Sequence, residues 1–249
     1  MILAAGVGKR MRSDIPKVLH RADGHLLVDY VIDNVHEAGI RRIVVVIGHK
    51  HELVRQELAG QPVELVVQEP QLGTGHAVQM AVPILGNFDG DLVVLCGDMP
   101  LVSSATISRL VQTRRRHRSA VTVLTVRLDD PSYYGRVVRN SDGDVEAIVE
   151  YRDADERVRR IDEVNTASYC FDYRKLLDVL SELRPENAQA EYYLTDTVAL
   201  FRAKGLNVSA VLADNSNEGL GVNSIEELAF VEKLIKEQKK LRSSKEKKD

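Results

Sequence analysis

The sequence predicts an α/β protein: a doubly wound, mostly parallel sheet with a small inserted β-rich subregion. Continuous apolar runs at 43–47 and 92–95, the first rich in β-branched residues, are typical of strands covered on both faces. Between such runs apolar residues recur at helical spacing, as at Leu27, Val31 and Val35. Strands and helices that alternate through short connections form parallel sheets with right-handed crossovers.

In the first half of the chain, predicted strands and helices alternate regularly. Gly39 is placed to end the first of its helices. We expect strands at 2–4, 43–47, 63–67, 92–95 and 121–126, and helices at 27–38, 51–59, 74–85 and 104–116.

The regular alternation of strands and helices ends after Leu128. The residues 140–144 have the composition of a hairpin turn between strands at 136–139 and 145–150. A capping box formed by Ser224 and Glu227 opens a last helix. We therefore expect one domain over 1–225, a C-terminal helix over 226–242 and a disordered, charged tail over 243–249. The remaining expected elements are strands at 163–171 and 208–212 and helices at 173–183 and 192–203.

Composition limits the classes of partner. The chain has 249 residues, 44% of them hydrophobic, and a net charge of −3, so we expect neither nucleic acid nor membrane as a partner. The absence of a long apolar run or of signal-peptide organisation favours the cytoplasm. Cys96 and Cys170 lie in apolar runs, which favours buried free thiols over a disulfide, and no Cys/His cluster has the spacing of a zinc site.

The first seventeen residues have the features of a phosphate-binding loop. A short strand leads into a bend of small residues, where glycine allows backbone N–H groups to approach an anion. Arg10 and Lys17 add one forked cation and one point charge at the same place. An ordinary strand-to-helix turn with surface cations remains the alternative, because the glycine spacing matches neither the dinucleotide fingerprint nor the P-loop.

Two further polar clusters follow predicted strands, where ligands bind in open parallel sheets. Asp98 comes directly after the most apolar strand and is well placed to hold Mg²⁺ against phosphate oxygens, although it could simply cap a turn before Pro100. Gln68 offers the donor and acceptor that suit a pyrimidine edge, or it is a solvated loop residue. Thr74 could cap its helix or help to bind a ligand. We expect His76 to be structural, and the basic run 114–118 to be a solvated helix face.

Taken in order, the motifs resemble those of the nucleotide-sugar pyrophosphorylases, and most closely the uridylyltransferase half of the bifunctional bacterial enzyme that makes UDP-N-acetylglucosamine, a peptidoglycan precursor. The matching segments are LAAGVGKRM with PKVLH, QEPQLGTGHAV, GDMPL, YGRVVR, IVEYRDA, EVNTASY, NAQAEYYLTD and GVNS. The resemblance covers nearly the whole chain. It implies a Rossmann-like nucleotidyltransferase fold and the Mg²⁺-dependent transfer of a uridylyl group from UTP to a sugar 1-phosphate, with N-acetylglucosamine 1-phosphate as the expected acceptor and with release of pyrophosphate.

The resemblance also implies roles for particular residues. Arg10 and Lys17 would be catalytic and meet the triphosphate, and Asp98 and Asn223 would bind Mg²⁺. The sugar and its acetamido group would contact Gly135, Glu150 and Asn165. The nucleotide would be bound by Leu3, Ala4, Ala5, Gly6, Gly8, Gln68, Gly73 and Thr74.

The chain departs from this family pattern in several places. Lys9 stands where Thr is frequent, Cys96 where an aromatic is usual, and Ala167-Ser168 where Gly and an aliphatic are common. The last two departures leave the identity of the sugar open. Because the sequence ends soon after the last expected helix, we expect the trimer-forming β-helix half that carries acetyl transfer in the family to be missing, which leaves the oligomeric state open. We also expect the first strand to be cut short.

Three other interpretations compete with the proposed reaction. The same chemistry could act on glucose 1-phosphate, another sugar phosphate or another nucleotide. A non-catalytic sugar-nucleotide sensor would be expected to lose its cations and metal ligands first, yet Arg10, Lys17, Asp98 and Asn223 are all present. A dinucleotide-dependent oxidoreductase lacks support, because the third glycine and the acidic residue that closes the second strand are missing.

Overall fold

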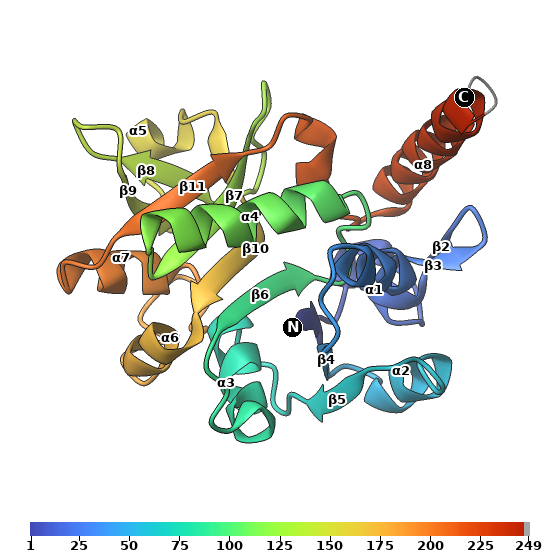
Figure 1. Ribbon diagram of the computed structural model, residues 1–249, viewed down its shortest axis with the longest axis horizontal. Helices are drawn as coiled ribbons and strands as arrows, with labels where there is room; N and C mark the ends of the chain where they lie inside the picture. Colours follow the sequence, from blue (N-terminus) through green and yellow to red (C-terminus); the bar gives the residue numbers. More distant parts are fainter. Residues whose placement is uncertain (247–249) are drawn as a thin grey trace.

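The computed structural model describes residues 1–246, apart from the side chains of Lys9 and of the residues from 241 onward. Its centre is a nine-stranded sheet in the order β11-β7-β10-β6-β1-β4-β5, with β8 and β9 attached beside β10 (Figure 1). The strands are β1 (Ile2–Ala4), β4 (Val44–Ile47), β5 (Glu64–Val67), β6 (Asp91–Cys96), β7 (Val121–Arg127), β8 (Arg136–Arg139), β9 (Val145–Val149), β10 (Glu163–Asp172) and β11 (Val208–Leu212).

The sheet is mostly parallel, which confirms the predicted fold class. The pairs β1–β4, β1–β6, β4–β5 and β7–β11 are parallel, whereas β10 runs antiparallel to both β6 and β7. Because β10 is reversed, its first residues lie at the edge where the parallel strands end. The chain crosses from β1 to β4 and β5 on one side and returns to β6 on the other, so the topological switch point lies between β1 and β6.

Helices cover both faces of the sheet, and this explains the continuous apolar runs. Val45 and Ile47 of β4 face one core, and Val44 and Val46 face the other, so all four are buried. One core is covered by α1 (Leu27–Glu37), α2 (His51–Glu57) and α4 (Ser104–His117). The other is covered by α3 (Thr74–Leu85), α6 (Tyr173–Leu180) and α7 (Asp196–Ala203).

Several short elements were not predicted from the sequence. The hairpin of β2 (Arg21–Ala22) and β3 (His25–Leu26) stands apart from the main sheet, and the helix α5 (Glu156–Arg159) is capped by Asp155. The 3-10 turns are η1 (Lys9–Met11), η2 (Lys17–Leu19) and η3 (Ser216–Gly219).

Two predictions, the start of the helix at 192–203 and the solvated basic run at 114–118, need correction. The helix expected at 192–203 begins only at Asp196, because the backbone of Tyr192 bonds to the loop before α3: its N–H donates to Leu72 (2.8 Å) and its carbonyl accepts from Gly75 (2.7 Å). The basic run is only partly a solvated face. Arg114 is 15% exposed and pairs with Asp91 at the start of β6.

The last helix, α8 (Ile225–Glu246), runs past residue 242, where we expected it to end. Val231 and Ile235 are buried against Met11 and Leu101, and beyond them α8 leans away from the body of the domain (Figure 1). The residues 243–246, expected to be disordered, are helical. The rest of the predicted disordered tail, 247–249, lies outside the described residues. Within 1–246, none of the helices has the length and apolar character needed to cross a bilayer.

Candidate active site

The loop after β1 leaves the sheet at the switch point and brings backbone close to Lys17. Gly8 has a φ of 65°, and a Cβ there would lie 3.0 Å from the Cβ of Lys17. A side chain at this position would therefore be both strained and crowded, which explains the glycine. A Cβ at Gly6 would meet no atom within 4 Å, so this stretch of backbone is open to a ligand. These features agree with the predicted phosphate-binding loop.

Lys17 joins the two predicted metal ligands. Its Nζ forms an ion pair with Asp98 Oδ2 and donates a hydrogen bond to Asn223 Oδ1 (2.8 Å). The side chains of Lys17 and Asp98 are only 17% and 14% exposed. The backbone supports the same arrangement, because the N–H of Val222 donates to the carbonyl of Asp98 (2.9 Å). The structure thus brings together three residues that are far apart in the sequence.

The donor set formed by Asp98 and Asn223 suits a divalent cation. One carboxylate and one amide oxygen already share a cation, the Lys17 ammonium, which shows that the two oxygens converge on one point. Among the described side chains, which end at residue 240, no three His, Cys, Asp or Glu groups come together as a metal-binding group. Two protein oxygens supplemented by phosphate oxygens and water are the usual environment of Mg²⁺, which rarely has an all-protein cage.

A cavity of about 660 Å³ opens beside this cluster. Five residues expected at the site line it: Gly8, Arg10, Lys17, Glu150 and Asn223. Four further lining residues were missed by the sequence reasoning: Tyr133, Tyr151, Arg152 and Gln189. Three of them lie inside the motifs IVEYRDA and NAQAEYYLTD, and Tyr133 directly precedes YGRVVR, so their place in or beside these motifs was the available signal.

The residues expected to contact a sugar are neighbours. The backbone N–H of Asn165 donates to the carbonyl of Gly135 (2.9 Å), and a Cβ on Gly135 would lie 3.3 Å from Glu150 Oε2. Glu150 Oε1 accepts a hydrogen bond from the Thr195 hydroxyl (3.2 Å), and burial raises the pKa of the Glu150 carboxyl. Asn165 is more enclosed than expected: its Nδ2 donates to the Tyr169 hydroxyl (2.8 Å) and its Oδ1 accepts from the Ala167 N–H.

The residues expected to bind the base form a second cluster on the loop between β5 and α3. Gln68 is buried, and its Nε2 donates to the Gly73 carbonyl (2.9 Å) and lies 3.2 Å from His76 Nδ1. The N-cap of α3 is Gly73 and not Thr74, whose hydroxyl instead accepts a hydrogen bond from the Leu194 N–H (3.0 Å). These residues lie apart from the described walls of the cavity.

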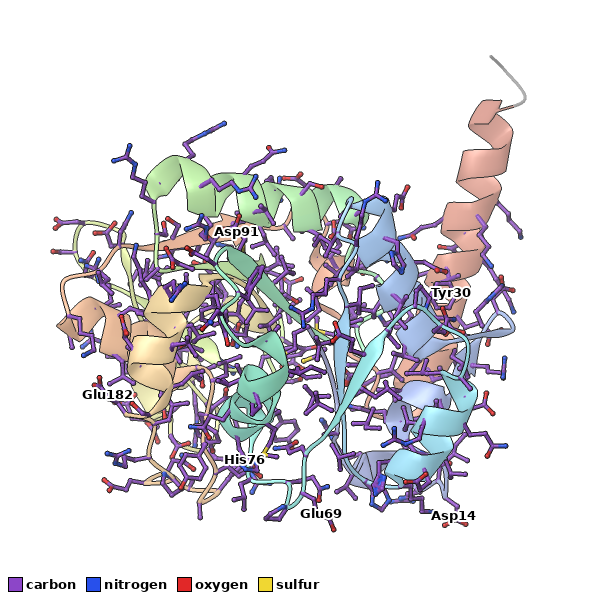
Figure 2. The ribbon with its side chains drawn as sticks, turned by 60° about the horizontal axis from the view of Figure 1, so that its bottom comes forward. Asp14, Tyr30, Glu69, His76, Asp91 and Glu182 are labelled. Carbon is purple, nitrogen blue, oxygen red and sulfur yellow. The ribbon has the colours of Figure 1, made fainter. Side chains whose placement is uncertain are left out.

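The two loops nevertheless adjoin one another. A Cβ on Gly48, which follows β4, would lie 2.7 Å from the Ala5 Cβ and 2.9 Å from Gln71 Nε2. The loop after β5 therefore reaches the loop after β1 through Gly48. In Figure 2, Glu69 and His76 lie in the lower part of the view, and Asp91, which starts β6, lies in the upper half.

A family model described as "MobA-like NTP transferase domain" matches residues 1–188. The chain belongs to this family. The prediction of a nucleotidyltransferase is thereby confirmed, and the protein is an enzyme of this class.

Several curated relatives carry the name "Bifunctional protein GlmU". The relative from Geobacillus thermodenitrificans is 44% identical over 237 residues, and that from Pelotomaculum thermopropionicum is 45% identical over 236 residues. Each alignment covers 95% of this chain and 51% of the relative. The chain therefore spans about half the length of the curated relatives that it matches.

Two positions at which this NTP transferase differs from the pyrophosphorylase pattern, Cys96 and Ala167, are in contact in the structure. Cys96 Sγ lies 3.8 Å from the Ala167 carbonyl oxygen, and Ala167 has a φ of 54° in a β-bulge between Asn165 and Tyr169. The left-handed conformation explains why Gly is common at position 167. Cys96 is a free cysteine whose residue as a whole is partly exposed, but its thiol group is enclosed, and this burial raises the thiol pKa to about 12. The Lys9 side chain lies outside the described part of the structure.

Proposed function

We propose that this nucleotidyltransferase transfers a uridylyl group from UTP to N-acetylglucosamine 1-phosphate and releases pyrophosphate. The observation that carries the proposal is the convergence of Lys17, Asp98 and Asn223 at the switch point, beside a cavity that also contains Arg10 and Glu150. The choice of UTP and of the acetamido sugar is supported by the motif resemblance and by the relatives named GlmU.

The chemistry requires positioning and charge neutralisation more than acid–base catalysis. A phosphate oxygen of the sugar phosphate, already ionised, attacks the α-phosphorus of UTP, and the bond from that phosphorus to the bridging oxygen of pyrophosphate breaks. Negative charge then accumulates on pyrophosphate, where Arg10 and Lys17 would stabilise it. Mg²⁺ held by Asp98 and Asn223 would neutralise further charge on the phosphate oxygens.

The residues around Glu150 would hold the acceptor. With its pKa raised by burial, Glu150 is placed against Gly135 and Thr195, and its carboxyl can pair with sugar hydroxyl or amide groups. Gln68 and the Gly73–Thr74 loop would bind the base. The smaller side chain of Cys96 favours one alternative, the same reaction with a different sugar 1-phosphate.

Pyrophosphate release over a panel of UTP and dTTP with N-acetylglucosamine 1-phosphate and glucose 1-phosphate tests the proposal. We expect release to be fastest with UTP and the acetamido sugar, and to require Mg²⁺. Faster turnover with glucose 1-phosphate would replace the sugar in the proposal. Tight UTP binding by calorimetry without release from any pair would instead indicate a sugar-nucleotide sensor.

A further inference from the structure

Asn223 lies directly before α8, and the first turn of that helix holds its backbone. Glu227 Oε2 accepts hydrogen bonds from the backbone N–H groups of both Asn223 (2.5 Å) and Ser224 (3.1 Å). In return the Glu227 N–H donates to Ser224 Oγ (3.2 Å). A capping box requires only the hydrogen bond from Ser224. The additional one to Asn223 extends the cap by one residue, into the active site.

The segment that carries Asn223 is fixed from the other side by the site itself. The Val222 N–H donates to the Asp98 carbonyl, and the Asn223 Nδ2 donates to the Gly221 carbonyl (3.1 Å). The Gly221 N–H lies 3.4 Å from the Tyr134 hydroxyl, the acceptor of its hydrogen bond. Asn223 is therefore the point where contacts from the sheet edge and contacts from α8 meet.

The packing of α8 against the domain fixes the position of the Glu227 backbone. Val231 lies one turn after Glu227 and is 1% exposed, and Ile235 follows one turn later at 4%. Both pack in a core with Met11, which ends η1, and Leu101, which follows Asp98 by three positions. Movement of the first turn of α8 would thus be opposed by the same segments that carry Arg10 and Asp98.

We propose that Glu227 is a positioning residue for the divalent cation. By accepting the Asn223 N–H it fixes the backbone from which Asn223 Oδ1 is directed toward Lys17 and Asp98. This inference rests on the proposed function, in which Asn223 is a metal ligand. Partners of a metal ligand commonly change metal affinity or activity by about 10- to 100-fold when they are removed. A helix cap alone would affect folding stability and leave metal affinity unchanged.

The chain offers a matched control, because Ser224 and Glu227 are the two halves of one capping box. Ser224→Ala removes the hydroxyl that accepts the Glu227 N–H but leaves the Glu227 carboxylate on Asn223. Glu227→Ala removes the contact to Asn223. Glu227→Gln keeps a carbonyl oxygen that can accept from the same N–H groups.

The experiment measures Mn²⁺ binding to the protein with UTP, from the electron paramagnetic resonance signal of the free ion against a UTP-only blank. Asn223→Ala is measured in parallel, and thermal melts report stability. We expect Glu227→Ala to weaken Mn²⁺ binding about tenfold. Ser224→Ala and Glu227→Ala should lower the melting temperature by similar amounts, but Ser224→Ala should keep the Mn²⁺ affinity within about twofold of the wild type. Glu227→Gln should stay close to the wild type.

Three results would overturn the inference. The first two leave the proposed function standing, whereas the third is a failure of the proposed metal site. If Asn223→Ala weakens Mn²⁺ binding and Glu227→Ala does not, the metal site stands and Glu227 is only a cap. If Ser224→Ala weakens binding as much as Glu227→Ala, the start of the helix acts as a whole. If Asn223→Ala itself leaves binding unchanged, the proposed metal role of Asn223 is wrong and the inference falls with it.

Discussion

Replacing Lys17 with Met separates the structural role of its ammonium group from its proposed catalytic role. The change leaves the Asp98 carboxylate, 14% exposed, without its ion-pair partner. Losing one partner of a fully buried pair costs about 3–5 kcal/mol, and an exposed pair contributes about 0–1 kcal/mol. For this mostly buried pair we expect a loss of about 2 kcal/mol in the free energy of unfolding, or a fall of about 4–8 °C in the melting temperature for a domain of this size.

Mg²⁺ should restore the stability of this variant but not its activity. At the proposed metal site, a cation would have to displace the ammonium from Asp98 and Asn223 in the wild type, whereas in Lys17→Met these oxygens would be free to receive it. We therefore expect Mg²⁺ to raise the melting temperature of the variant more than that of the wild type. Turnover should stay at least about 10²-fold lower, because the positive charge at the triphosphate is missing.

Thermal melts with and without Mg²⁺, together with the pyrophosphate-release assay, check both effects. Lys204→Met is the control, because Lys204 pairs with Glu182 on the surface, where the two side chains are 40% and 41% exposed. This control should lose less than about 1 kcal/mol and should respond to Mg²⁺ like the wild type. A Lys17→Met variant as stable as the wild type, with the same response to Mg²⁺, would refute the reasoning.

Three further predictions concern Arg10, Asp196 at the start of α7, and Ala167. Arg10→Ala should lower turnover about 10²-fold or more in steady-state assays. Arg12→Ala is the control and should be near-neutral, because Arg12 is exposed and does not line the cavity. Turnover of Arg10→Ala close to the wild type would exclude the role of Arg10. Burial raises the pKa of Asp196 to about 6, so unfolding free energy should fall as pH rises from about 4 to about 6. Asp196→Asn should remove this dependence on pH and raise the unfolding free energy by about 1 kcal/mol at pH 7, after allowance for the partial exposure of Asp196. Denaturant titrations at about pH 4 and at pH 7 check this, and an unchanged pH dependence in the variant would show that Asp196 is not its source. Ala167→Gly should stabilise the fold by about 0.5–1 kcal/mol, because φ is 54° there, and a destabilised variant in the same titrations would contradict this account.

The central sheet could be predicted because its strands and helices have clear local signals. The alternate residues of β4 fill two different cores, and this leaves a continuous apolar run in the sequence. The start of α7 could not be predicted in this way. Helical spacing continues back to Tyr192, but tertiary hydrogen bonds to Leu72 and Gly75 hold that residue outside the helix.

The candidate site was only partly accessible from the sequence. The switch-point rule places Asp98 beside the loop after β1, but no spacing rule relates Lys17 to Asn223, which are 206 positions apart. Their association came from the motif resemblance. The hydrogen bond from Asn223 to Glu227 was hidden for a different reason: the capping-box pattern accounts for Glu227 completely, so the sequence gives no signal that its carboxylate reaches one residue further.

The position of the metal in a complex tests the account most directly. A crystal of the protein with Mn²⁺ and a non-hydrolysable UTP analogue, measured at a wavelength where manganese scatters anomalously, locates the ion without ambiguity. We predict an anomalous peak at coordinating distance, about 2.2 Å, from both an Asp98 carboxylate oxygen and Asn223 Oδ1, with the Lys17 ammonium moved onto the phosphates. A peak elsewhere, such as beside Glu150 and Asp196, or an ammonium still seated between Asp98 and Asn223, would contradict the account.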